Sequence, residues 1–345
     1  MGKQKTVAGV PRRRVPARRA RVKGRKAHLK EVGMTANTRK RYKAAIMRFF
    51  VYLIHWGIRT PRNVEELDLE LSEFINHLWQ DDLPEQHAMD ALSGFGRLLP
   101  HCRGKLPIAR SYFANWRKTL VRVRALPLTL LMVTGLAGLA YGAGRPDLAA
   151  VFLTGFRGLL RSDEMVSLKF SMVLPFPEKD KCMILLQGKS GVRHNIVEKI
   201  IIEDKAVVNA ILVAKASARS DFVYASSERQ LSADLKWLGD LGGLPLSNLT
   251  LYALRRGGAT YDFQQHFTMG KTMELGRWAT EKTARIYIDQ AMAQQAEVSL
   301  TPQSLKILKS GQRVASSLLN MNPKQAAREL AAKSKRQTSF LNRGG

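Results

Sequence analysis

The stretch LGRWATEKTARIYID, residues 275–289, places Trp278 nine residues before Tyr287 in a strongly basic chain. Most tyrosines in such a setting pack in a core and take no part in chemistry. A tyrosine can instead act as a nucleophile when neighbouring groups activate it and fixed cations stabilise the charge that develops. The rest of the sequence decides which description applies to Tyr287.

The charge of the chain points to a polyanionic partner. Its 345 residues include 56 Lys and Arg against 28 Asp and Glu, a formal net charge of +28. Residues 1–30 contribute +12 and residues 303–345 contribute +8, which leaves +8 for the body. Nucleic acid is the commonest partner for such a balance, and an anionic membrane surface is the alternative.

The first third of the sequence predicts a basic arm followed by a helical domain. Residues 1–34 carry almost no large apolar side chains, so we expect a disordered basic arm. Its block PRRRVPARRARVKGRK is typical of a DNA-backbone arm, a nuclear localisation signal, or both. Residues 35–122 then show helical periodicity with basic exposed faces, which predicts a small helical bundle. Its helices are expected at 35–56, 66–80, 86–99 and 107–122.

The remaining sequence mixes helices with a few strands. The uncharged run 125–144 is interrupted by Pro127 and four glycines, so a pair of buried helices fits it better than a membrane span. We expect helices at 127–142 and 146–160, strands at 167–176, 182–190 and 193–204, and helices from about 204 onward. This predicts a fold that is mainly α with a small antiparallel β-sheet (α+β). We divide it into a second domain at 123–302 and a basic C-terminal tail at 303–345.

The sequence offers no pattern typical of a metal or cofactor site. There is no DxD, HExxH or Cys/His cluster, and Cys102 and Cys182 are eighty residues apart. We therefore expect no metal, no cofactor and two free thiols. Cutting a DNA strand without a metal requires a nucleophile, fixed cations and an acid for the leaving oxygen. Suitable side chains occur in order along the chain: Arg161 in FRGLLRSDEMVSL, Lys189 in QGKSGVRHN, Arg255 in LYALRRGGAT, and Tyr287.

These four pieces resemble the catalytic domain of the tyrosine recombinases, also called phage-type integrases. GLLRSDE matches the family's GLLR-x-x-E, GKSG matches its hairpin lysine, and YALR matches its H-x-L-R box. GRWATEKTARIY matches the G-H/W…Y box with one residue inserted after the glycine, and Arg255 precedes Tyr287 by 32 residues. The sequences LRRGGAT and TARIYI are most similar to those of recombinase-like proteins of eukaryotic mobile elements, such as the DIRS type.

The resemblance implies a helical, SAM-like core-binding domain at 35–122 and a catalytic tyrosine-recombinase domain at 123–302. It also implies the role of each matched side chain. Arg161 and Arg255 clamp the scissile phosphate, since bidentate guanidinium geometry suits that task. Lys189 protonates the departing 5′ oxygen, and the Trp278 indole N–H helps to hold the phosphate. Tyr287 attacks the phosphorus and forms a 3′-phosphotyrosyl link.

Two features of the sequence bear on this match. Tyr252 replaces the histidine of the H-x-L-R box, and a tyrosine with a pKa near ~10 donates hydrogen bonds but shuttles protons poorly at neutral pH. Arg157 lies one turn before Arg161 and competes for the first arginine position. We prefer Arg161 because Glu164 and Leu168 follow it at the family spacing, where Glu164 can hold a neighbouring backbone or basic group.

The expected function is site-specific DNA strand cleavage and rejoining, in the recombination or integration of a mobile element. The implied partners are double-stranded DNA and three further copies of the chain, with no membrane partner. The implied location is the nucleus for a eukaryotic protein, and otherwise the cytoplasm or nucleoid. Two alternatives stay open: a catalytically inactive, domesticated DNA-binding protein of the same fold, and a type IB topoisomerase-like relaxing enzyme.

Overall fold

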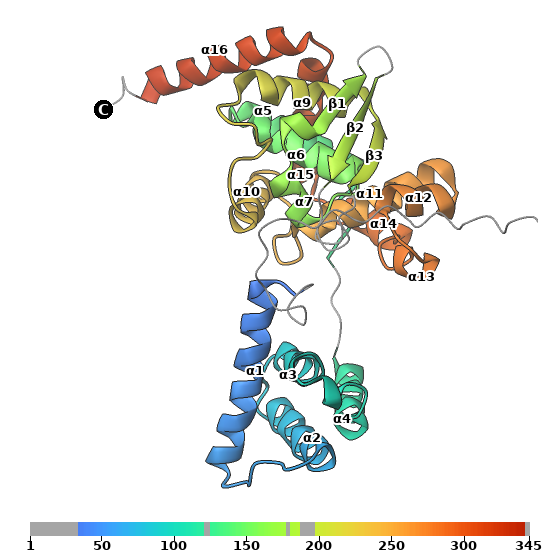
Figure 1. Ribbon diagram of the computed structural model, residues 1–345. Coiled ribbons are helices and arrows are strands. Elements are labelled where there is room, and N and C mark those ends of the chain that lie inside the picture. Colours follow the sequence, from blue (N-terminus) through green and yellow to red (C-terminus); the bar gives the residue numbers. More distant parts are fainter. Residues whose placement is uncertain (1–33, 121–124, 177–179, 187–196, 342–345) are drawn as a thin grey trace, which may run out of the picture. The chain divides into compact units, whose positions relative to one another are not determined.

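A computed structural model describes residues 34–120, 125–176, 180–186 and 197–341 (Figure 1). Contacts divide the chain into two compact units, Met1–Val121 and Arg122–Gly345, called unit 1 and unit 2 below. This division falls one residue before the boundary expected between residues 122 and 123. Residues 1–33 of the expected basic arm, and the hairpin residue Lys189, lie outside the described residues.

Unit 1 is a bundle of helices around an aromatic core. Its elements are α1 Ala36–His55, α2 Val64–Gln80, α3 Glu85–Leu98, the 3-10 turn η2 Pro100–Cys102 and α4 Pro107–Thr119 (Figure 1). Thr35 caps the start of α1, and Gly57 lets the chain turn after it with a φ of +64°. Phe49 of α1 is fully buried and meets the rings of Phe74 and Phe95 edge-on, at 5.6 and 5.4 Å. The first helix, expected to have a basic exposed face, therefore turns its apolar side toward the core.

Unit 2 is mostly helical and carries one small sheet. Its helices are α5 Leu130–Gly142, α6 Pro146–Arg157, α7 Ser162–Ser167, η3 Phe170–Met172, α9 Lys205–Ser217, α10 Glu228–Leu241, α11 Leu251–His266, α12 Met269–Gly276, α13 Glu281–Ala284, α14 Gln290–Val298, α15 Pro302–Leu319 and α16 Pro323–Leu341. Strands β1 Val173–Phe176, β2 Lys181–Leu186 and β3 Glu198–Glu203 pair antiparallel in the order β1-β2-β3. The predicted fold class, mainly α with a small antiparallel sheet, is confirmed.

Two predicted elements begin later than the sequence pattern suggested. The predicted first strand started at residue 167, but β1 starts at Val173. Upstream of it, the Phe170 N–H donates to the Asp221 carbonyl at 2.7 Å, so this segment pairs outside the sheet. The predicted helix at 127–142 starts at Leu130, because the Leu128 N–H donates to the Ala253 carbonyl at 3.1 Å and holds the preceding residues extended.

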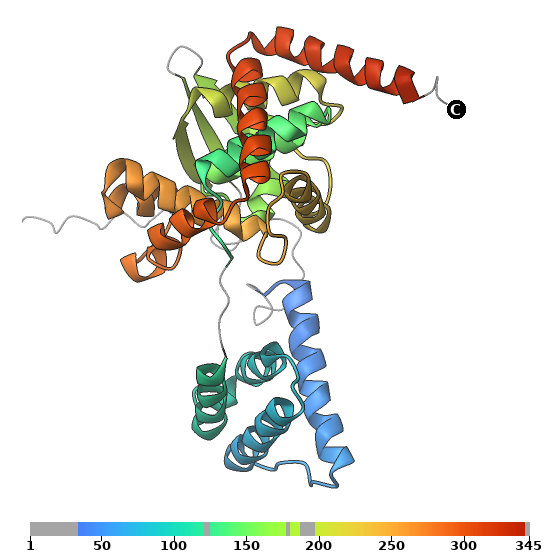
Figure 2. The same ribbon diagram turned by 180° about the vertical axis from the view of Figure 1, so that it is seen from behind.

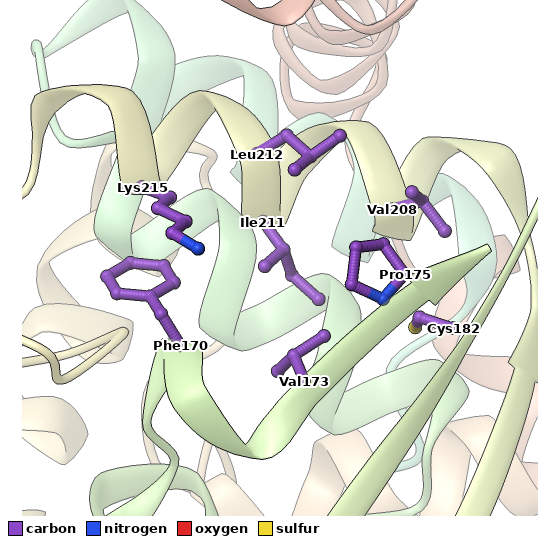
Figure 3. Close-up of a pocket in the computed structure, with 8 residues that line it drawn as sticks. All are labelled: Phe170, Val173, Pro175, Cys182, Val208, Ile211, Leu212 and Lys215. Atoms are coloured by element: carbon purple, nitrogen blue, oxygen red, sulfur yellow. The ribbon is translucent and has the colours of Figure 1, made fainter. Parts of the chain in front are cut away.

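One face of the sheet packs against α9 (Figure 3). Val208 and Ile211 of α9 lie over Val173 of β1 and Cys182 of β2, around an apolar gap of about 20 Å³. Burial raises the pKa of the Cys182 thiol to about 11. Cys182 and Cys102 are both free and buried, as expected from the sequence.

Helices α5 and α15 approach each other so closely that only glycine fits at the crossing. A Cβ added to Gly138 of α5 would lie 1.7 Å from the Gly311 carbonyl oxygen, and one added to Gly311 of α15 would lie 2.3 Å from the Gly135 carbonyl oxygen. Figure 2 shows α15, in red, crossing the green α5. The uncharged run 125–144 thus includes a buried helix of the core, as predicted. No helix within the described ranges has the length and apolarity needed to cross a bilayer.

The segment expected to be a basic C-terminal tail is helical and forms part of unit 2. Leu308, Ala315 and Leu318 of α15 are buried in the same core as α5 and α6. Ala326 and Leu330 of α16 are buried there too. The basic residues Lys306, Lys309, Arg313, Lys324 and Arg328 therefore lie on helices with an apolar face, which agrees with the helical character expected from about residue 204 onward.

We expect Gly138→Ala to lower the free energy of unfolding of unit 2 by about 1–3 kcal/mol or more, because the new methyl group would push α5 away from the Gly311 backbone. Urea unfolding monitored by circular dichroism measures the change. Gly142→Ala is the matched control, since a Cβ at Gly142 meets nothing within 4 Å. This control should be neutral or gain up to about 1 kcal/mol from its higher helix propensity. Equal losses in the two variants would contradict the crossing described here.

Candidate active site

The start of α7 positions the first arginine of the predicted site. Glu164, which is 2% exposed, accepts hydrogen bonds from the backbone N–H of Arg161 at 2.8 Å and from its Nη1 at 2.6 Å. Acidic residues are favourable in the first turn of a helix, where backbone N–H groups are unpaired. The predicted role of Glu164, which was to hold a backbone group and a basic side chain, is therefore confirmed.

Arg161 and Glu164 shift each other's titration through their contact. Burial alone would lower the pKa of the half-buried Arg161, but the Glu164 carboxylate outweighs burial, so its pKa is raised. Burial alone would raise the pKa of Glu164, but Arg277 and the hydrogen bonds from Arg161 outweigh it and lower this pKa. Both side chains therefore stay charged at neutral pH.

Arg157, which competes with Arg161 for the first arginine position of the motif, makes its contacts elsewhere. Its Nε lies 2.5 Å from Asp204 Oδ2, and its guanidinium stacks on the ring of Tyr261 with 4.8 Å to the centroid. These partners lie outside the group of residues around Tyr287. The geometry thus agrees with the sequence-based preference for Arg161.

Helix α11 brings Arg255 into a buried position through two close backbone approaches. A Cβ on Gly257 would lie 1.8 Å from the Leu128 carbonyl oxygen, and one on Gly258 would lie 2.0 Å from the Phe156 carbonyl oxygen. These glycines therefore allow α11 to rest directly on the backbone of α6 and of the segment before α5. Arg255 is thus presented from a helix that packs tightly on its neighbours.

The Arg255 guanidinium joins three parts of the site. It is 2% exposed, Nη1 donates to the Leu159 carbonyl, and Nη2 donates to the Gly276 carbonyl at 2.7 Å. Its Cζ lies 5.0 Å from the Trp278 ring centroid and 5.2 Å from that of Tyr287. Burial and the neighbouring Arg277 lower its pKa to about 10, so it remains a cation at neutral pH. Its Nε has no hydrogen-bond partner.

Tyr287 lies in contact with two aromatic side chains and one cation. Its ring centroid is 4.6 Å from that of Trp278, which is 8% exposed and packs on Leu159. The centroid of the Tyr252 ring lies 5.1 Å from that of Tyr287. Burial and the neighbouring Tyr287 raise the pKa of Tyr252 above its usual range, so its hydroxyl keeps its proton at neutral pH and is able to donate a hydrogen bond.

The structure thus brings together five of the six predicted site residues. Arg255, Trp278, Tyr287 and Tyr252 are in ring or cation contact, as described above. Arg161 joins them through Glu164, which also accepts a hydrogen bond from Arg277 at 2.9 Å. Within the described ranges, no group of three or more His, Cys, Asp and Glu side chains has a metal-binding arrangement.

Two further arginines belong to this region but were not assigned from the sequence. Arg277 is the residue inserted before Trp278, and that insertion was the signal for it. Arg256 is fully buried, its Nη1 donates to the Ala125 carbonyl, and its Nη2 contacts Asp289 Oδ2 at 3.0 Å. Asp289 lies two residues after Tyr287 and caps α14. Arg256 therefore ties α11 to the segment that follows the tyrosine. The sequence contains a second arginine in LRRGGAT, but it does not show in which direction that side chain points.

Comparisons with known proteins agree with this geometry at the level of the fold. No protein-family model and no curated protein matches the sequence. Among solved structures, the chain is similar to the XerH site-specific recombinase bound to palindromic difH substrate in a post-cleavage complex, with a TM-score of 0.50 and 15% identity over 76% of this chain and 79% of that chain. It is also similar to a lambda integrase dimer bound to a COC′ core site, with a TM-score of 0.51 and 16% identity over 75% of this chain and 90% of that chain. The chain has the fold of the tyrosine recombinases.

We expect Glu164→Gln to destabilise unit 2 by about 3 kcal/mol at neutral pH, because it leaves buried arginines without their counter-charge. The pKa of Glu164 in the folded state lies below its ordinary 4.5. Its contribution is therefore fully present above that pH and is lost as the pH falls through the lower, folded-state value. Urea unfolding at a series of pH values should show that the difference in the free energy of unfolding between the wild type and the variant becomes smaller in acid.

The control for this pH series is Glu281→Gln. Glu281 is half exposed in its pair with Arg285, at 51%, so its loss should change the free energy of unfolding by less than about 1 kcal/mol at every pH. If the difference in the free energy of unfolding between the wild type and Glu164→Gln stayed constant or grew in acid, this would contradict the lowered pKa assigned to Glu164.

We expect Arg256→Met to cost about 3 kcal/mol, because it leaves the Asp289 carboxylate and the Ala125 carbonyl without their buried donor. Thermal and urea unfolding measure this loss. Arg285→Met is the matched control, since that side chain is 70% exposed and should contribute less than about 1 kcal/mol. If both variants were equally stable, Arg256 would not be the link described here.

Proposed function

We propose that the chain cleaves and rejoins DNA strands at specific sites, through a 3′-phosphotyrosyl intermediate on Tyr287, in the recombination or integration of a mobile element. The observation that carries this proposal is the contact of the Tyr287 ring with Arg255, a buried cation whose Nε has no partner. A buried donor without a partner is costly, and a phosphate oxygen would satisfy it.

The chemistry follows from the charges around Tyr287. Its Oη attacks the phosphorus, the new P–O bond forms as the bond to the 5′ oxygen breaks, and Arg161 and Arg255 stabilise the negative charge on the non-bridging oxygens. The resemblance assigns protonation of the departing 5′ oxygen to Lys189. Burial raises the pKa of Tyr252, so this residue stays a neutral phenol and does not accept the phenolic proton of Tyr287, which passes to solvent water.

Unit 1 supports DNA as the partner. Lys40, Lys43 and Arg48 of α1 are exposed, on the side of the helix away from Phe49. Arg110, Arg117 and Lys118 of α4 are also exposed. Such basic helices contact phosphates and confer salt-dependent affinity. We extend the proposal to a tetramer on double-stranded DNA and, for a eukaryotic protein, to the nucleus.

Tyr252 supports a second candidate, a catalytically inactive DNA-binding protein. The histidine that it replaces in the family pattern can bind and release a proton near neutral pH, whereas Tyr252 keeps its phenolic proton. This candidate predicts strong, salt-sensitive DNA binding without any covalent product.

The test uses a pool of nicked duplexes with random sequence, so that no target site needs to be known. The nick lets the short strand diffuse away after cleavage and traps the covalent product. We expect wild-type protein to become attached to DNA on denaturing gels and Tyr287→Phe to give no detectable adduct, because phenylalanine lacks the attacking oxygen. Tyr261→Phe is the matched control and should still form the adduct, since Tyr261 packs on Arg157 away from the site.

The DNA recovered from the adduct separates the candidates. A shared sequence motif supports site-specific cleavage. Adducts without a motif, together with relaxation of supercoiled plasmids, would indicate a topoisomerase-like enzyme instead. DNA binding without any adduct would contradict the proposal and favour the inactive binder.

A further inference from the structure

Arg277 has no role in the chemistry described above, although it lies at the centre of the site. It ends α12 in the left-handed conformation, with a φ of +57°, which is uncommon for a residue with a side chain. Its backbone N–H donates to the Glu274 carbonyl at 3.1 Å. This turn separates Gly276, whose carbonyl binds Arg255, from Trp278, whose ring contacts Tyr287.

One nitrogen of Arg277 connects the two arginines of the proposed phosphate clamp. Its Nη2 donates to the Leu159 carbonyl at 3.0 Å and to Glu164 Oε2 at 2.9 Å. The Leu159 carbonyl also accepts from Arg255, and Glu164 also accepts from Arg161. Arg277 therefore shares one acceptor with each of them.

The other nitrogens of Arg277 are buried and have no hydrogen-bond partner. Its side chain is 9% exposed, and both Nε and Nη1 are unsatisfied. The nearest additional carboxylate, Glu198, lies 3.7 Å from Arg277 Nε and 3.6 Å from Arg161 Nη1, which is outside hydrogen-bond distance. Leaving such donors unpaired is expensive, since a buried guanidinium has lost its bonds to water.

The local charge also favours an anion. The guanidiniums of Arg161, Arg255 and Arg277 gather around the carboxylates of Glu164 and Glu198, and Asp163 adds a further negative charge near Arg161. Burial lowers the pKa of both Arg255 and Arg277, and the mutual repulsion of the arginines lowers it further. A bound anion would relieve that repulsion and supply hydrogen-bond acceptors for three nitrogens that lack one. Two of them are on Arg277, whose Nε has only the 3.7 Å ion pair with Glu198, and one is on Arg255.

We propose that Arg277 is a third phosphate-binding arginine of this site, with Nη2 fixed on Leu159 and Glu164 while Nε and Nη1 donate to an oxygen of the scissile phosphate. The ligand class is a DNA phosphodiester, and this assignment rests on the proposed function. The added fixed cation belongs to a site in which Tyr252, a neutral phenol, stands where the family pattern has a histidine. Arg277 thereby supplies positive charge that a protonated histidine would otherwise provide.

The first test observes the arginine Nε–H groups directly by nuclear magnetic resonance while inorganic phosphate is added. Signals are assigned by their loss in Arg277→Lys, Arg255→Lys and Arg256→Lys. We expect the Arg277 and Arg255 signals to shift together and saturably. The Arg256 signal is the internal control, because this Nε is also buried and unpaired but its guanidinium is held by Asp289 and Ala125. A shift of Arg255 without Arg277, or of neither, would overturn the proposal.

The second test measures how much Arg277 contributes to affinity. With the Arg255 signal as reporter, Arg277→Gln should weaken phosphate binding by about 10- to 100-fold, the loss expected for charged hydrogen bonds. Arg285→Gln, an exposed cation on the neighbouring α13 turn, should leave the affinity unchanged. Unchanged affinity in Arg277→Gln would overturn the proposal. If this variant does not fold, the phosphate titration of the wild-type Arg277 and Arg255 signals still tests the proposal.

A third test separates phosphate contact from simple positioning. On a duplex recovered from the adduct screen, an uncharged methylphosphonate replaces the scissile phosphate. The cleavage defect of Arg277→Gln should then shrink relative to the wild type, because there is less charge to stabilise. An equal defect on both substrates would show that Arg277 acts only through Glu164 and Leu159. Phosphate binding at Arg277 without any adduct would instead defeat the proposed function and leave the anion site intact.

Discussion

The buried carboxylate of Glu164 is the interaction on which the rest of the site depends. It is 2% exposed, yet it accepts from the Arg161 backbone, from the Arg161 side chain and from Arg277. A buried charge is tolerated only when it is fully paired, so the two guanidiniums are held where the carboxylate requires them. Leu159 adds the second fixed point, because its left-handed backbone, with a φ of +47°, presents a carbonyl to both Arg255 and Arg277.

Much of the fold could be predicted from the sequence where the signal was local. The helix of unit 1 that begins after Thr35 and ends before Gly57 is an example, since its cap, apolar stripe and terminal glycine all agree. The start of β1 could not be predicted, because it depends on a hydrogen bond between Phe170 and Asp221, which is fixed only in the folded chain. The C-terminal segment was assigned from its charge, but its apolar face and Gly311 decide where it packs.

The candidate site divides in the same way. Arg161, Arg255, Trp278 and Tyr287 were found because each lies in a short motif with a characteristic spacing. Arg277 and Arg256 were missed because nothing in a sequence reports which way a side chain leaves a turn or a buried helix. Both directions follow from tertiary packing: the left-handed end of α12 for Arg277, and the burial of α11 against Ala125 for Arg256.

The crossing of α5 and α15 has a consequence for how the protein is made. α5 is the first helix of unit 2 in the described residues and is apolar on nearly all sides, while its partner α15 follows α6 to α14 in the chain and leaves the ribosome after them. During synthesis α5 therefore lacks its packing partner at a time when Arg161, Arg255 and Tyr287 have all left the ribosome. The core is completed, and the arginines are rigidly held, only after α15 has been synthesised. Before that point a nascent chain would carry the residues of the proposed cleavage site without being able to carry out the reaction.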